Sequence, residues 1–82
     1  MLSPNEFRSP VFTPTLTARE MQVLASLMLG KSNREIGKEL FVAESTVRFH
    51  MASIFQKLGV PTRTAAAVVG WEMFPMLRGP SE

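Results

Sequence analysis

The sequence contains no cysteine, no tyrosine and no aspartate, and its only histidine is His50. The absence of cysteine excludes disulfide bonds and thiolate metal ligands, so the fold must be held together by packing, as is usual in a reducing compartment. Metal binding and catalysis need clusters of titratable side chains, and a phosphate-accepting receiver domain needs an aspartate. We therefore expect no enzyme, no receiver domain, and no metal or other cofactor.

Long apolar runs are also missing. No stretch approaches the roughly 18 consecutive apolar residues of a membrane span, and residues 1–10 lack the basic-then-apolar plan of a secretory signal. A length of 82 residues with 45% hydrophobic content is enough for one small core and too short for two independent domains. The sequence therefore predicts a single-domain, soluble and cytoplasmic protein.

The formal net charge of +2 is modest, and its distribution is uneven. Between residues 45 and 64 the charged side chains are Arg48, Lys57 and Arg63, whereas glutamates are found upstream of this segment. The pattern predicts a basic segment without compensating acidic residues, which suits a nucleic-acid partner. A solvated face that carries cations by chance is the alternative.

Helix boundaries follow from capping signals. Thr17 with Glu20, and Ser32 with Glu35, have the spacing of capping boxes, which predicts helices over about 17–29 and 32–40. Gly30 is placed to end the first of them. The prolines of residues 1–15 indicate an N-terminal tail or linker ahead of the domain.

Two further helices are expected over about 44–58, ended by Gly59, and over about 63–74, before Pro75. The predicted fold is all-α, a four-helix bundle with a central helix-turn-helix. The domain is expected to span residues 16–75 and to be followed by a C-terminal tail over 76–82. On the third helix the spacing places an apolar stripe on one side and small, polar or basic residues on the other. The apolar residues are Val47, Met51, Ile54 and Leu58, and the outward ones are Ser45, Arg48, Phe49, Ala52 and Gln56.

A short helix, a turn at residues 41–43 and a longer helix with an outward polar face have the build of a DNA-binding helix-turn-helix. The major groove admits one helix, and its base edges offer acceptors to arginine and thymine methyl groups to apolar side chains. Arg48, Phe49 and Ala52 suit these partners. The pattern predicts sequence-specific binding of double-stranded DNA.

Several strings in the chain resemble the LuxR-type (LuxR/FixJ/NarL, GerE-like) DNA-binding domain over about residues 15–69. They are Leu16-Thr17-x-Arg19-Glu20, Gly30-x-Ser32-Asn33-x-Glu35-Ile36, Thr46-Val47-Arg48-x-His50, Lys57-Leu58-Gly59-Val60 and Arg63. The resemblance implies a bacterial transcriptional regulator that binds DNA as a dimer, and most such domains are the output end of a longer protein.

The resemblance places Arg48, Phe49 and Ala52 at base-facing positions. It implies phosphate contacts from Thr46, Lys57 and Arg63. Lys31 and Asn33 at the start of the second helix, and Ser45 at the start of the third, are further phosphate candidates, since a helix N-terminus offers free N–H groups to anions.

The chain departs from the family pattern at two places. Ala43 stands where a capping serine is usual, so the third helix is expected to fray at its start or to begin at Ser45. Ala52 stands where a longer polar side chain is common, so base reading must rest more on Arg48 and Phe49. Phe49 has an alternative role, packing on the N-terminal leader near Phe12, and a packing role is favoured for His50.

The fourth helix is apolar nearly all round, and Val68, Trp71 and Met73 are the candidate dimer interface. A symmetric pairing of this helix would place two recognition helices about 34 to 36 Å apart. The same face could instead dock a partner, which would make the chain a protein-interaction module. A sigma-factor-like promoter-binding domain, with RNA polymerase as a partner, is a third alternative.

Overall fold

The computed structural model describes residues 15–74, and this part of the chain is entirely helix, turn and loop. Its helices are α2 (Ala18–Met28), α3 (Asn33–Leu40), α4 (Glu44–Leu58) and α5 (Arg63–Met73). The predicted all-α fold with four helices and a central helix-turn-helix is confirmed, and each helix boundary lies within one residue of its prediction. The predicted tails, 1–15 and 76–82, lie outside the described residues except for Thr15.

Both predicted capping boxes are present. The Thr17 side chain accepts a hydrogen bond of 3.1 Å from the Glu20 N–H, and the Thr17 N–H donates to the Glu20 carboxylate at 2.9 Å. Ser32 and Glu35 form the same pair of bonds at 3.1 and 2.7 Å. Each box satisfies two N–H groups that a helix start leaves without an intrahelical partner, so α2 and α3 begin where the local sequence dictates.

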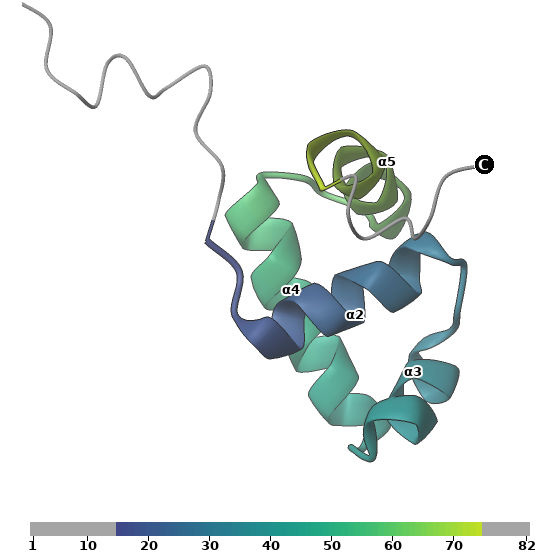
Figure 1. The fold of residues 1–82 in the computed structure, drawn as a ribbon. Coiled ribbons are helices and arrows are strands. Elements are labelled where there is room, and N and C mark those ends of the chain that lie inside the picture. Colours follow the sequence, from purple (N-terminus) through teal and green to yellow (C-terminus); the bar gives the residue numbers. More distant parts are fainter. Residues whose placement is uncertain (1–14, 75–82) are drawn as a thin grey trace, which may run out of the picture.

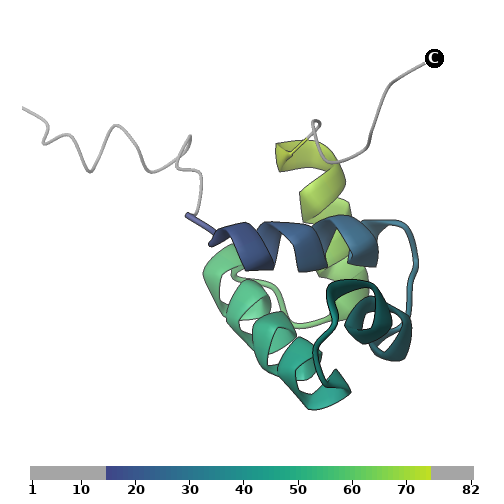
Figure 2. The same ribbon diagram turned by 60° about the horizontal axis from the view of Figure 1, so that its bottom comes forward.

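The core forms around α2, which contacts the other three helices and passes through the middle of the group (Figures 1 and 2). Fully buried aliphatic side chains come from α2, α3 and α4, and α5 contributes the small Ala66. The buried apolar residues are Val23, Leu24, Leu27, Met28, Ile36, Val47, Met51, Ile54, Ala66 and Phe74. Burial of this set is the main stabilising term, because the described residues contain no covalent cross-link.

The corner between α3 and α4 depends on Gly37. A Cβ atom at this position would lie 2.8 Å from the carbonyl oxygen of Val42 and 3.6 Å from a side-chain methyl carbon of Val47. The chain therefore turns back directly against the backbone of α3, and only a residue without a Cβ atom allows this close approach. Phe41 ends α3 in the left-handed conformation, with φ of 60°.

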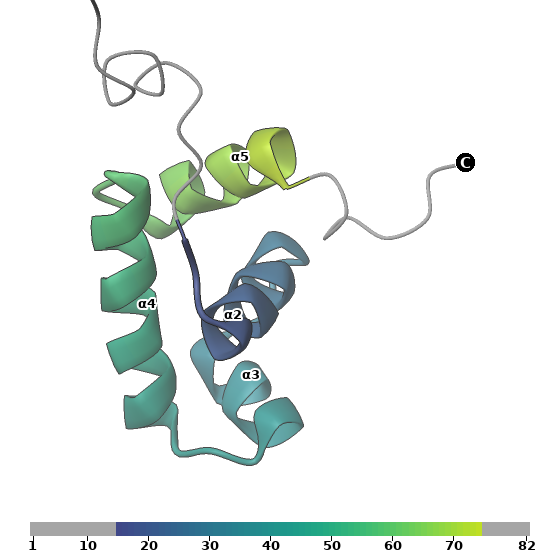
Figure 3. The same ribbon diagram turned by 60° about the vertical axis from the view of Figure 1, so that its left-hand side comes forward.

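α4 is the longest helix, and one of its long sides faces away from the other three (Figure 3). Val47, Met51 and Ile54 are buried on the inner side, as the helical spacing of the apolar residues predicted. Leu58 is half-buried against the core. None of the helices in residues 15–74 has the length and hydrophobicity needed to cross a membrane.

Candidate nucleic-acid interface

The outward side of α4 carries the three predicted base-facing residues. Arg48, Phe49 and Ala52 are all exposed, and the ring of Phe49 is largely in solvent, with 72% of the residue accessible. Because residues three and four positions apart are neighbours on a helix surface, the three form one continuous patch. Ser45 and Gln56 extend this patch toward the two ends of the helix and are also exposed.

Arg48 has an acidic partner in the structure. Its Nη1 lies 3.4 Å from a carboxylate oxygen of Glu44, one helical turn earlier, and both side chains are at least half exposed. The sequence predicted a basic segment without compensating acidic residues, and this prediction is wrong at Arg48. Glu44, at the start of α4, lies four residues earlier on the same helix face and pairs with the Arg48 guanidinium. An exposed pair of this kind contributes only about 0–1 kcal/mol, so Arg48 can exchange it for another anion at little cost.

The rings of Phe49 and His50 meet edge to face, with centroids 5.9 Å apart. His50 is half-buried, which suits the packing role that the sequence favoured for it. The alternative partner for Phe49, Phe12, lies outside the described residues.

The start of α4 lacks a side-chain cap, as the alanine at position 43 implied. The helix nevertheless begins at Glu44 and not at Ser45, because the Ala43 carbonyl accepts hydrogen bonds from the N–H groups of Thr46 and Val47 at 3.0 and 3.2 Å. Ser45 is exposed and Thr46 is half-buried.

Lys57, a predicted phosphate contact, is bound to a buried carboxylate. Its ammonium group donates a 2.8 Å hydrogen bond to Glu20, and the hydroxyl group of Ser53 donates another of 2.6 Å to the same carboxylate. Burial alone would raise the pKa of Glu20, but the hydrogen bonds from Lys57, Ser53 and the Thr17 N–H, together with the charge of Lys57, lower that pKa from 4.5 to about 2. Glu20 therefore stays ionised and holds α4 against α2.

Three other predicted phosphate contacts come together where α5 meets the loop between α2 and α3. The Arg63 guanidinium donates to the Asn33 side-chain oxygen at 2.9 Å and to the Lys31 carbonyl. Lys31 in turn binds the carboxylate of Glu39, and this hydrogen bond from the ammonium group lowers the pKa of Glu39. The two Arg63 contacts join positions 30 and 32 residues apart, whereas Lys31 and Glu39 are eight apart. Lys31, Asn33 and Arg63 thus each have a partner within the protein.

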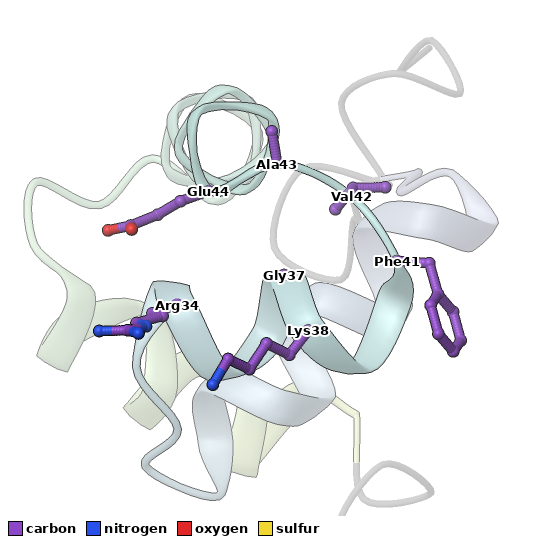
Figure 4. Close-up of a pocket in the computed structure, with 7 residues that line it drawn as sticks. All are labelled: Arg34, Gly37, Lys38, Phe41, Val42, Ala43 and Glu44. Carbon is purple, nitrogen blue, oxygen red and sulfur yellow. The ribbon is translucent and has the colours of Figure 1, made fainter.

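Sequence reasoning passed over two cations on α3. Arg34 and Lys38 are exposed on the helix side opposite Ile36, and neither has a hydrogen bond or ion pair among the described residues. They line an open hollow of about 370 Å³ between α3 and the start of α4 (Figure 4). Its lining residues are Arg34, Gly37, Lys38, Phe41, Val42, Ala43 and Glu44. The four-residue spacing of the two cations was the signal in the sequence that could have identified them.

α5 has a buried side and an apolar exposed side. Ala66 and Gly70 face the core, whereas Val68, Trp71 and Met73 are 51%, 39% and 38% exposed. The predicted interface residues therefore lie on the surface of the single chain. No cluster of three or more potential metal ligands occurs in residues 15–74.

A family model described as bacterial regulatory proteins of the luxR family matches residues 14–69. The spore germination protein GerE of Bacillus subtilis is 43% identical over 67 residues, which are 82% of this chain and 86% of GerE. The transcriptional regulatory protein LnrK of the same organism is 44% identical over 64 residues, or 78% of this chain. The chain spans only 29% of LnrK, so the similarity to this relative is confined to one part of a longer protein.

A solved structure is also similar. The crystal structure of the response regulator ChrA of a heme-sensing two-component system matches with a TM-score of 0.69 and 38% sequence identity, covering 94% of this chain and 40% of that one.

Proposed function

The chain belongs to the LuxR family of bacterial regulatory proteins, and on this premise we propose that it regulates transcription by binding double-stranded DNA sequence-specifically, with α4 in the major groove. One observation carries the proposal: Arg48, Phe49 and Ala52 are exposed together on α4, at positions three and four residues apart. The major groove, about 12 Å wide, admits a single helix. Regulators of this family are not enzymes, which agrees with the expectation from the sequence.

In this proposal Arg48 and Phe49 make the main contacts to the base edges. The Arg48 guanidinium can form two hydrogen bonds to guanine, and the Phe49 ring and the Ala52 methyl group are suited to thymine methyl groups. Arg48 must leave Glu44 to do so, and the exposure of that pair keeps the cost small.

Phosphate contacts place the helix in its groove. Ser45 and Thr46 at the start of α4, and Lys31, Asn33, Lys57 and Arg63 around it, are proposed for this role. The internal bonds of Lys57 and Arg63 also orient the helices that meet DNA, so loss of either side chain would affect both the fold and the binding. Such contacts carry affinity and register, and no sequence preference.

Dimerisation through α5 completes the proposal. Val68, Trp71 and Met73 would pair across a two-fold axis and set two copies of α4 about 34 to 36 Å apart, as a pseudo-palindromic site requires. RNA polymerase is a further candidate partner at the promoter. A regulator of this kind acts in the cytoplasm, on the nucleoid.

Selection from a randomised duplex library, sequenced and repeated at two salt concentrations, tests the proposal because base reading survives where phosphate attraction weakens. An enriched inverted repeat with half-sites about one helical turn apart is the expected result. No retention at either salt concentration would overturn it. In that case the exposed apolar side of α5 would favour the second candidate, a protein-interaction module.

A further inference from the structure

Three glutamates in residues 15–74 use their carboxylates to cap a helix or to join two segments of the chain. They are Glu20, Glu35 and Glu39. Glu44 differs from them, because its ion-pair partner is Arg48, on the same helix and on the outward patch. Its carboxylate therefore belongs to the surface that is proposed to read DNA.

Glu44 and Arg48 present opposite charges on one side of α4. They are four positions apart, so they are neighbours on the helix surface, and both side chains are at least half exposed. Four residues advance about 6 Å along a helix axis, and successive base pairs of DNA are about 3.4 Å apart. When Arg48 meets a base edge, Glu44 therefore lies within about two base pairs of it.

The two side chains need opposite partners. Arginine only donates hydrogen bonds, whereas an ionised carboxylate only accepts them. In the major groove guanine presents two acceptors, thymine presents one acceptor, and cytosine presents an amino group that donates. A carboxylate held against a base edge therefore favours cytosine and is repelled by guanine and thymine.

We propose that Glu44 selects cytosine at a base pair within about two base pairs of the one that Arg48 reads. The inference rests on the proposed function, since it assigns a specificity role on the same surface of α4. When Arg48 exchanges Glu44 for guanine, the freed carboxylate accepts a hydrogen bond from the cytosine amino group. Much of the discrimination is repulsive, because a wrong base would place an acceptor against the negative charge.

A competing arrangement is available to the freed carboxylate. Glu44 also lines the hollow with Arg34 and Lys38 (Figure 4). A carboxylate that turned toward these two cations would contact no base, so Glu44 would then have no influence on sequence preference. The two arrangements are distinguished by comparing duplexes that differ at a single base pair.

The test uses the full chain and a randomised duplex library, followed by fluorescence anisotropy on single-base variants of the enriched site. Arg48→Ala identifies the base pair that the arginine reads. At a second base pair nearby, we expect wild type to favour cytosine over guanine by about tenfold. Glu44→Gln should abolish this preference and shift it toward adenine, because an amide group can donate as well as accept. Binding to the enriched site itself should not weaken, since the amide oxygen still accepts from cytosine.

Glu35→Gln is the matched control. It removes an equal charge from an exposed residue of α3, and the amide oxygen can still accept the capping hydrogen bond from the Ser32 N–H. This variant should change the affinity for every duplex by the same factor. Partial unfolding would also weaken binding to all duplexes equally, so only a changed ratio between duplexes supports the role of Glu44.

Three results would overturn the inference and leave the proposed function standing. The first is an enriched site with no cytosine preference near the base pair that Arg48 reads. The second is an unchanged base preference in Glu44→Gln. The third is a loss of preference only at the base pair that Arg48→Ala also affects, because Glu44 would then act through Arg48. If the wild-type chain enriches no sequence, the proposed function fails, and the inference fails with it.

Discussion

The ammonium group of Lys57, near the end of α4, lies 2.8 Å from a carboxylate oxygen of Glu20, in the first turn of α2. The same carboxylate caps α2 through the Thr17 N–H and accepts a hydrogen bond from Ser53. One buried side chain thus fixes the start of the domain and the orientation of the helix that is proposed to read DNA. The position of the outward patch depends on this ionised group.

Acid should weaken the fold through Glu20. Its pKa is about 2 in the folded chain against 4.5 ordinarily, so the unfolded chain takes up a proton first as the pH falls. The resulting stabilisation, at most about 3 kcal/mol, is present above pH 4.5 and is lost as the pH falls toward 2. Urea denaturation of Glu20→Gln and wild type between these pH values should give free energies of unfolding that converge at low pH. Glu35→Gln, at the same position of the exposed capping box, is the control. If the free energies of unfolding of Glu20→Gln and wild type differed by the same amount at every pH, the role of the charge would be contradicted.

Substitutions at Arg48 and Glu44 should change DNA binding in opposite directions. Arg48→Ala is expected to cost about 1–3 kcal/mol and to relax the preference at one base pair. Glu44→Gln removes the intramolecular partner of Arg48 and a negative charge near the phosphates, so affinity should rise by up to about fivefold. Fluorescence anisotropy on the selected site and its single-base variants measures both effects. Equal losses on every sequence for Arg48→Ala would show that it contacts phosphate and reads no base.

The end of α3 stores strain that a glycine would relieve. Phe41 has a φ of 60° and is 93% exposed, so the residue bears the cost of a left-handed backbone without burying its ring. Phe41→Gly should stabilise the chain by about 0.5–1 kcal/mol, whereas Phe41→Ala keeps the strain and should change little. Thermal denaturation distinguishes them. Clear destabilisation by Phe41→Ala would mean that the ring packs on the protein.

Two glycines inside helices should respond differently to alanine. A Cβ atom at Gly37 would lie 2.8 Å from the backbone oxygen of Val42, which cannot move without opening the corner, so Gly37→Ala should destabilise by about 1–3 kcal/mol. At Gly70 the nearest atom is the Met28 sulfur at 2.7 Å, and a flexible side chain can shift. The gain in helix propensity should then make Gly70→Ala nearly neutral. Urea denaturation should show a larger decrease in the free energy of unfolding for Gly37→Ala than for Gly70→Ala. A larger decrease for Gly70→Ala would contradict the argument.

The α5 surface should control association. Val68 is 51% exposed in the single chain, so Val68→Gln should leave the fold intact and weaken the proposed dimer by roughly tenfold. Sedimentation velocity over a range of concentrations measures the change, with Gln22→Ala on the exposed side of α2 as the control. A wild-type chain that remains monomeric throughout would rule out the α5 dimer.

Much of the fold could be read from local sequence. Helix starts follow from side chains three residues apart, as in Thr17 with Glu20, and helix ends follow from glycines that adopt positive φ, such as Gly59. The inward and outward sides of α4 follow from the 3.6-residue period. These signals act over one or two turns of chain, which is why every helix boundary was predicted to within one residue.

The partners of the charged side chains were decided by the tertiary structure. Lys57 meets Glu20 across 37 positions and Arg63 meets Asn33 across 30, and no local pattern specifies which distant groups a long flexible side chain will reach. By itself the sequence determined the helices, their capping and the residues that α4 turns outward. Only the packing of those helices decided which cations are held inside the protein and which, Arg34 and Lys38, are left free of partners within residues 15–74, because that choice depends on distances set by the whole fold.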